Sequence, residues 1–128
     1  MDYFFENSDV VRDYECDLQG IVNNANYQHY FEHSRHLFLR NKGVSFAELH
    51  NEGIDVVVAR VEIVYKTPLR SDDRYVCKLR VDKDMIKYVF MQAIYRESDN
   101  KLCARAKTEC VAVVDGKLAD VPKLNQLL

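Results

Sequence analysis

The feature of the sequence that most constrains the fold is a change in hydrophobic period near residue 53. Between Asn24 and Gly43, apolar or small residues recur every three to four positions, which predicts one amphipathic helix of about four to five turns. The residues that form this stripe are Tyr27, Tyr30, Phe31, Ser34, Leu37 and Phe38. From Ile54 onward the apolar residues alternate with polar ones, as they do in strands with one buried face. One long helix followed by several long strands predicts an α+β fold in which a single antiparallel sheet packs against the helix.

Residue types at the ends of the helical stretch indicate where the helices begin and end. Asn23 or Asn24 can cap the long helix, because an Asn side-chain oxygen accepts a hydrogen bond from a free backbone N–H. Gly43 suits the left-handed conformation that commonly follows the last turn of a helix. The segment "SFAE" at 45–48 matches a capping box, which predicts a short second helix that ends at Gly53.

Five strands are expected in total. The first is a weak strand within residues 3–15, and the others are a segment from Ile54 to Pro68, then 74–82, 85–97 and 101–115. The short turns "DKD" and "SDN" predict that the last three strands pair as antiparallel hairpins.

Strict alternation in the second strand predicts which residues share each of its faces. One face is expected to present Val57, Ala59, Val61, Ile63 and Tyr65, and the opposite face Val56, Val58 and Val64. Long strands with apolar residues on both faces favour pairing with another chain. We therefore expect an oligomer.

Composition limits the class of protein. The 128 residues contain no linker or repeat and predict one domain, residues 1–128. Acidic residues outnumber basic ones by 20 to 18, which argues against nucleic acid as a partner. The longest apolar runs are far too short to span a membrane. With no secretory signal and no CxxC spacing among its four cysteines, the chain is expected to be cytoplasmic with reduced thiols.

A carboxylate and a glycine lie where the first strand gives way to the long helix. Asp17 and Gly20 stand in the segment "YECDLQGIVNN", directly before the helix starts. A junction of this kind either caps the helix or builds a functional site.

The sequence around this junction resembles the hot-dog-fold thioesterase superfamily, and in particular its 4-hydroxybenzoyl-CoA thioesterase branch. The matching residues, in order and spacing, are Cys16, Asp17, Gly20, Ile21, Val22, Asn26, Tyr27, Phe31, Glu32 and Arg35. Two later segments, "VVVARVEIVYKTPLRSDD" and "DGKLADVPK", also resemble this family, so the similarity extends nearly from end to end.

This resemblance implies a fold and a reaction class. The hot-dog fold is a long central helix wrapped by a five-stranded antiparallel sheet, and its members form homodimers or homotetramers by joining sheets edge to edge. The implied substrate is a thioester of coenzyme A or of an acyl carrier protein. Neither a metal nor another cofactor is implied.

The resemblance also implies roles for individual residues. Asp17 would act as nucleophile or general base, and backbone N–H groups at Asn24 and Ala25 would stabilise the oxyanion. Gly20 would let the loop pass close to the ligand, and Tyr27 would line the acyl pocket. Many bacterial relatives have His where this chain has Asn24, which favours a mechanism that uses the acid and backbone amides.

Other residues are assigned with less specific patterns. Candidates for binding the phosphates of coenzyme A are Arg60, Lys66, Arg70, Arg74, Arg105 and Lys107. Glu32 is expected to form a salt bridge with Arg35 or to be solvated, rather than to act as a second acid. The row His29, His33 and His36 lies off the apolar stripe and lacks the HExxH order, so we expect a solvated or interface face and no metal site.

Two alternatives to an acyl-CoA thioesterase remain open. The first is a thioesterase for acyl carrier protein, which would share the fold and the catalytic residues. The second is a module that binds acyl thioesters without hydrolysing them, in which Asp17 serves only as a capping residue.

Overall fold

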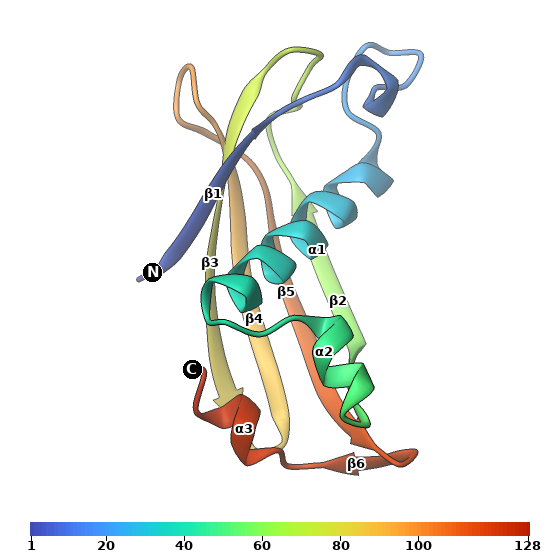
Figure 1. Ribbon diagram of the computed structural model, residues 1–128. Coiled ribbons are helices and arrows are strands. Elements are labelled where there is room, and N and C mark those ends of the chain that lie inside the picture. Colours follow the sequence, from blue (N-terminus) through green and yellow to red (C-terminus); the bar gives the residue numbers. More distant parts are fainter.

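The computed structural model describes residues 1–128 (Figure 1). Its elements in chain order are β1 (Phe5–Val10), a single 3-10 turn (Asp13–Glu15), α1 (Asn24–Asn41), α2 (Phe46–Asn51), β2 (Ile54–Tyr65), β3 (Arg74–Asp84), β4 (Lys87–Arg96), β5 (Lys101–Val114), β6 (Lys117–Ala119) and α3 (Pro122–Asn125). The helix, the long strands and the α+β class predicted from the sequence are therefore confirmed.

The strands form one antiparallel sheet in the order β1-β3-β4-β5-β2. The expected hairpins β3-β4 and β4-β5 are both present, and the short strand β6 pairs with β5 beside this five-stranded path. β2 follows the helices in the chain but pairs with β5, at the far end of the sheet from β1. The two edges of the sheet are therefore β1 and β2.

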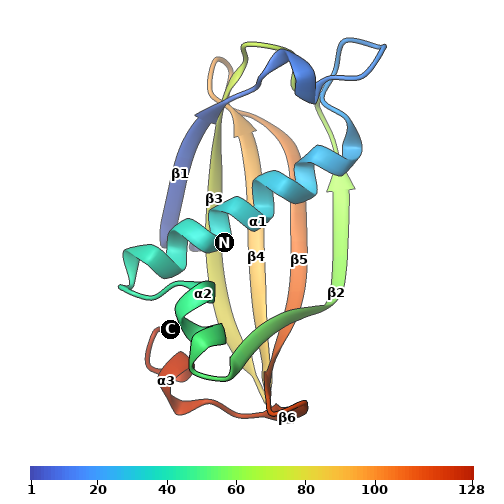
Figure 2. The same ribbon diagram turned by 45° about the vertical axis from the view of Figure 1, so that its right-hand side comes forward.

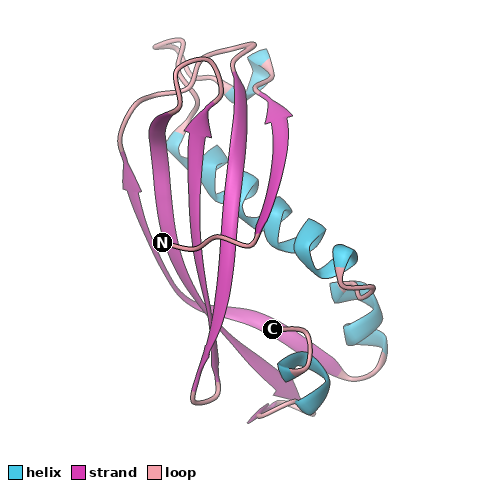
Figure 3. Ribbon diagram, turned by 90° about the vertical axis from the view of Figure 1, so that its left-hand side faces the viewer, coloured by secondary structure: helices cyan, strands magenta, loops and turns pink.

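The helices lie on one face of the sheet, and α1 crosses that face diagonally (Figures 2 and 3). The first turn of α1 lies near the end of β2, and its last turn lies near β1 and β3 (Figure 2). Because α1 crosses the sheet diagonally, it moves away from β2 along its length and leaves part of the sheet uncovered. The short helix α2 covers that part. This is the arrangement of a hot-dog fold.

The predicted helix ends are confirmed in detail. The Asn23 side chain accepts a hydrogen bond from Ala25 N–H, and Ser45 and Glu48 form the predicted capping box of α2. Gly43 follows α1 with a φ of +82°, a conformation that costs a glycine little. The four-residue helix α3 was not predicted from the sequence; it begins with Pro122, a residue that suits the first helical position.

Two apolar clusters form the core between the helices and the sheet. One lies under the first half of α1 and includes Tyr27, Tyr30, Phe31 and Leu69. The other lies under its second half and is centred on Phe38, which is 1% exposed and contacts the rings of Phe4, Phe5 and Phe90. The core therefore fixes α1 along its whole length.

A β-bulge in β2 makes the predicted assignment of faces wrong for the residues before the bulge, whereas Val61, Ile63 and Val64 lie on the predicted sides. The pairing of β2 with β5 shifts register between Val58 and Arg60, so that Val58 is opposite Cys110 and Arg60 is opposite Glu109. The extra residue reverses the alternation. The side chains that turn toward the helices are Val56, Val58, Val61 and Ile63, whereas Val57 turns to the outer face together with Val64.

The edge strand β2 exposes apolar surface on both of its faces. Val58 is 50% exposed on the helix side, and Val57 is 44% exposed on the outer side. Long apolar edge strands of this kind are templates for pairing with another chain. None of the helices in the structure combines the length and the hydropathy that crossing a membrane requires.

The position of Phe38 generates a test of the core. Replacing Phe38 with Ala removes a fully buried ring, and such changes cost about 3–5 kcal/mol of unfolding free energy. The matched variant Phe4→Ala also removes a ring that contacts Phe38, but Phe4 is 53% exposed. Its loss of unfolding free energy should therefore be much smaller. Urea denaturation of both variants measures the difference, and equal costs would show that α1 does not pack as described.

Candidate active site

The segment that contains Asp17 is a short hairpin in front of α1. Cys16 and Val22 are bridged as in an antiparallel pair, Asp17 N–H donates to the Ile21 carbonyl oxygen at 2.9 Å, and Gly20 N–H donates to the Asp17 carbonyl oxygen at 3.0 Å. These bonds close a turn between Asp17 and Gly20 and hold Asp17 at its first corner.

Gly20 is required in this turn by its backbone conformation. Its φ is +78°, in the left-handed region that other residues adopt only with strain. A Cβ atom built on Gly20 would meet no atom within 4 Å in this chain. Glycine is therefore favoured at position 20 by the backbone conformation of the turn that contains Asp17. Steric crowding by neighbouring atoms of this chain is not a reason for it.

Asp17 lies in a pocket of about 350 Å³ at the start of α1. The residues that line the pocket are Asp17, Gln19, Ile21, Val22, Asn24, Tyr27, Tyr65, Lys66, Thr67, Pro68 and Cys103. One carboxylate oxygen of Asp17 accepts a hydrogen bond from Gln19 N–H at 2.9 Å. Thus the structure brings together Asp17, Asn24 and Tyr27, as the sequence predicted.

The two helix N–H groups predicted to stabilise an oxyanion differ in their hydrogen bonding. Ala25 N–H donates to the Asn23 side-chain oxygen at 2.9 Å and is therefore occupied. Asn24 N–H has no acceptor within the chain. Because the start of a helix bears partial positive charge, Asn24 N–H is the amide suited to binding a negative oxygen in this pocket.

Glu15 connects the Asp17 hairpin to α1. Its carbonyl oxygen accepts hydrogen bonds from Asn23 N–H at 3.0 Å and from the Asn26 side-chain amide at 2.7 Å. Its carboxylate accepts from the Tyr30 hydroxyl at 2.9 Å and from Arg12 N–H at 2.7 Å. Burial, together with this carboxylate, raises the pKa of Tyr30, so its hydroxyl stays a donor.

Two tyrosines fix the other side of the pocket. Tyr27 Oη accepts a hydrogen bond from Leu69 N–H at 3.1 Å, and Tyr65 Oη donates to the Asn24 carbonyl oxygen at 3.2 Å. Their rings meet edge to face with 5.5 Å between centroids. Leu69, whose side chain is fully buried, also accepts from Val22 N–H, so the loop after β2 is attached to the hairpin and to the helix.

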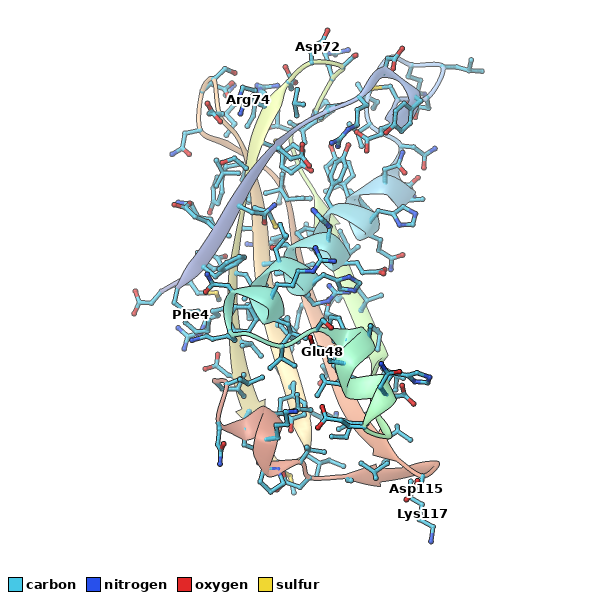
Figure 4. The ribbon with its side chains drawn as sticks, in the orientation of Figure 1. Phe4, Glu48, Asp72, Arg74, Asp115 and Lys117 are labelled. Atoms are coloured by element: carbon cyan, nitrogen blue, oxygen red, sulfur yellow. The ribbon has the colours of Figure 1, made fainter.

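The segment "VVVARVEIVYKTPLRSDD", which resembles the family and contains Tyr65, Pro68, Asp72 and Asp73, has a partly structural role. Tyr65 and Pro68 line the pocket, but the two acids make the turn into β3: Asp73 accepts from Arg70 N–H at 2.9 Å, and Asp72 adopts a φ of +69°. Figure 4 places Asp72 at the same end of the molecule as the Asp17 hairpin, with Asp115 and Lys117 at the opposite end.

Among the basic residues proposed to bind phosphates, the structure separates Arg60 from Lys66. Arg60 follows the bulge on the outer face of β2 and lies 3.9 Å from Glu109 and 3.8 Å from Glu62, so within one chain it is not part of the pocket. Lys66 lines the pocket. Cys103, which no sequence pattern indicated, also lines the pocket, and it is the residue left without a partner where the pairing of β4 with β5 shifts register.

Of the two positions expected for Glu32, the structure shows the solvated one, and no salt bridge joins Glu32 to Arg35. Glu32 is exposed, and its Oε1 lies 3.9 Å from His36 Nε2. Arg35 instead lies on the side of α1 that faces the sheet and is only 8% exposed. The structure contains no group of three or more His, Cys, Asp or Glu side chains placed to bind a metal ion.

Comparison with known proteins identifies the family. Residues 11–125 match the sequence profile described as the thioesterase-like superfamily. The chain belongs to this superfamily. The resemblance seen in the sequence is thus confirmed, and so is the class of enzyme, a thioester hydrolase.

Individual relatives agree with the profile. The chain is 34% identical over 114 residues to a candidate esterase of Aquifex aeolicus, covering 88% of each chain. It is also 34% identical over 109 residues to the chloroplastic acyl-acyl carrier protein thioesterase ATL2 of Arabidopsis thaliana, covering 84% of this chain but 58% of that protein.

Solved structures share the fold. A hypothetical protein from Aquifex aeolicus has a TM-score of 0.91 and 32% identity, with 97% of this chain and 98% of that chain covered. A 1,4-dihydroxy-2-naphthoyl-CoA thioesterase from Synechocystis has a TM-score of 0.90 at 19% identity, covering 95% of this chain and 92% of that chain. At such low identity, the second similarity shows the fold alone.

The contacts of Glu15 generate a test of how the hairpin is held. Tyr30→Phe removes the buried hydroxyl that donates to the Glu15 carboxylate, which should cost about 1–3 kcal/mol of unfolding free energy. Tyr14→Phe is the matched control, because Tyr14 is 78% exposed and its hydroxyl has no partner in the chain. Chemical denaturation compares the two, and a Tyr30→Phe protein as stable as Tyr14→Phe would contradict the anchoring role of Glu15.

Proposed function

We propose that the protein is an acyl-CoA thioesterase in which Asp17 supplies the catalytic carboxylate. The observation that supports this most directly is the content of one pocket: a carboxylate with one free oxygen and an unoccupied helix N-terminal amide at Asn24. A thioester needs these two groups, since its carbonyl carbon must be attacked while its carbonyl oxygen gains negative charge.

The chemistry has two forms that the same residues can perform. As nucleophile, Asp17 would attack the thioester carbon, release the coenzyme A thiolate and form an acyl-aspartyl anhydride, which water then cleaves to the free acid. As general base, Asp17 would take a proton from water as that water attacks the same carbon. In both forms Asn24 N–H stabilises the oxyanion, and the leaving thiolate takes up a proton from solvent.

The substrate-binding roles are assigned by position. Tyr27 and Tyr65 would contact the part of the acyl group next to the thioester, because both rings lie against the pocket. Lys66 is the basic residue of the pocket lining and is suited to a phosphate of the carrier. Gly20 and Ala25 would act indirectly, Gly20 by shaping the turn and Ala25 through its bond to the Asn23 cap.

An acyl carrier protein thioesterase is the second candidate. It is favoured by the similarity to the Arabidopsis acyl-acyl carrier protein thioesterases, one of which is 40% identical over 81 residues, 63% of this chain and 43% of that protein. Assaying one acyl group on coenzyme A and on an acyl carrier protein separates the two, because kcat/KM will be greater for the true carrier.

We further propose that residues 1–128 act as a single domain in a cytoplasmic homodimer or homotetramer. The cysteines are all free, as expected of a reducing compartment. The supporting observation for the oligomer is the apolar edge strand β2, whose Val57, Val58, Val61 and Val64 are 36% to 50% exposed. Arg60 on the same strand would then lie beside the second subunit.

Pairing through β2 generates a prediction about assembly. The double variant Val57→Lys/Val64→Lys places like charges on the outer face of this edge, so two β2 strands should repel each other. Light scattering at micromolar concentration should show an oligomer for the wild type and a monomer for the variant. Leu118→Lys, which changes an exposed residue on β6, should leave the oligomer intact. A wild-type monomer would contradict the proposal.

The role of Asp17 generates the central prediction. Asp17→Asn keeps an oxygen that can accept from Gln19 N–H, so the fold should be unchanged, while basicity and nucleophilicity are lost. Since a positioned base contributes about 10²–10⁴-fold, single-turnover hydrolysis of a good acyl-CoA should fall by that order while binding persists.

The matched control is Asn24→Ala, which retains the backbone amide and should lose much less activity. Thermal melts confirm that both variants are folded. If Asp17→Asn melts normally and still hydrolyses within a few-fold of wild type, the carboxylate is only structural. If the wild type binds acyl-CoA saturably without turnover, the protein is a binding module.

A further inference from the structure

A second polar site lies under α1, away from the Asp17 pocket. The guanidinium of Arg35 is buried between α1 and the sheet, where its Nη1 donates to Gln92 Oε1 at 3.1 Å and the group lies 5.9 Å from the centre of the Phe90 ring. No carboxylate of the chain lies within salt-bridge distance of Arg35. A buried cation with one neutral partner is costly to maintain.

The neighbouring hydroxyl is also without a partner. Thr108 on β5 is 1% exposed, and its Oγ1 makes no hydrogen bond in the structure. Buried polar atoms are nearly always paired, so an unpaired hydroxyl beside a buried cation that lacks an anionic partner points to a group that binds there.

Both residues line an open groove between α1 and β2. The groove has a volume of about 250 Å³, and its other lining residues are Gln28, His29, Phe31, Glu32, Val58, Val61 and Ile63. Its walls are thus mainly apolar along β2, with Arg35 and Thr108 on the inner side. The bulge of β2 is what turns Val58 toward this groove.

The groove begins close to the Asp17 pocket. Tyr27 lines the pocket and Gln28 lines the groove, while on β2 the corresponding residues are Tyr65 and Ile63. The Gln92 side chain accepts a hydrogen bond from the Arg35 guanidinium and donates one to the Phe31 carbonyl oxygen. The guanidinium therefore lies beside the turn of α1 that contains Phe31. From Asn24 to Phe31 the helix rises roughly 10 Å, which a medium-length acyl chain or a substituted aromatic ring can span.

We propose that this groove holds the acyl group of the substrate and that Arg35, with Thr108, binds an oxygen acceptor at its far end, most favourably a carboxylate. The inference rests on the proposed thioesterase function and adds a substrate class, acyl groups that carry a distal carboxylate or carbonyl oxygen. The fixed charge of Arg35 and its planar donors favour an anion over a neutral acceptor. Gln92 acts as a positioning residue that holds the guanidinium toward the groove.

The test compares three thioesters of equal length: octanoyl-CoA, 7-oxo-octanoyl-CoA and suberoyl-CoA, the last with a terminal carboxylate. Binding is measured by calorimetry to the full-length Asp17→Asn protein, so that hydrolysis does not interfere. Affinity is expected to fall from suberoyl-CoA to 7-oxo-octanoyl-CoA to octanoyl-CoA. Suberoyl-CoA should bind at least about ten-fold more tightly than octanoyl-CoA.

Arg35→Gln should abolish this order, and the matched control Arg40→Gln, an exposed arginine on the same helix, should preserve it. Thr108→Val provides an independent variant if Arg35→Gln does not fold, because it is similar in shape and removes only the hydroxyl. It should narrow the preference for an oxygenated tail without changing the affinity for octanoyl-CoA.

Each outcome decides the proposal. A preference for either oxygenated tail that depends on Arg35 supports it. It is overturned if octanoyl-CoA binds as well as both others, or if the order survives in Arg35→Gln. It is also overturned if Glu32→Gln and Arg35→Gln weaken subunit association alike and leave the order unchanged, because Arg35 then pairs with a second copy. If wild type neither binds nor hydrolyses any thioester, the proposed function itself fails.

Discussion

The position of the first turn of α1 is the constraint on which the site depends. Glu15 fixes this turn through its carbonyl oxygen and its carboxylate, and Tyr27 fixes it from the side of the loop after β2. Because the Asp17 hairpin lies between these attachments, the carboxylate and the helix N-terminus are held in one pocket by contacts that involve neither the Asp17 carboxylate nor Asn24 N–H. A site held in this way leaves Asn24 N–H unpaired at small cost, since helix N-termini always contain free N–H groups.

Much of the fold followed from the hydrophobic period, because period is a property of many residues together. The long helix and the long strands were predicted correctly for that reason, and the caps and hairpins followed from the residue types at the helix ends and in the short turns. The faces of β2 before its bulge were predicted wrongly, since a single inserted residue reverses the alternation and the segment "VVVARV" has apolar residues on both sides of the reversal. The bulge is determined by pairing with β5, a contact between distant segments that no local pattern records.

The site was predicted in part for a similar reason. Asp17, Asn24 and Tyr27 lie in one contiguous segment with a specific spacing, so their proximity could be inferred from the resemblance. Lys66 and Cys103 reach the same pocket from other strands. The burial of Arg35 was not predicted, because its charge suggested a possible ion pair with Glu32, although Arg35 stands four residues after Phe31 and therefore on the buried stripe.

The burial of Arg35 has a consequence for how the two ends of the groove work together. Removing an unpaired charge from water costs several kcal/mol in a protein interior, and within this chain Gln92 offsets only part of that cost. A carboxylate that reaches Arg35 would recover the remainder only when the acyl group is fully inserted in the groove. Since the far end of the chain and the thioester are parts of one molecule, that gain would also fix the thioester carbon opposite Asp17. Binding energy from the distal group would then contribute to orientation at the reacting centre, which is how remote contacts accelerate a reaction rather than merely tighten binding.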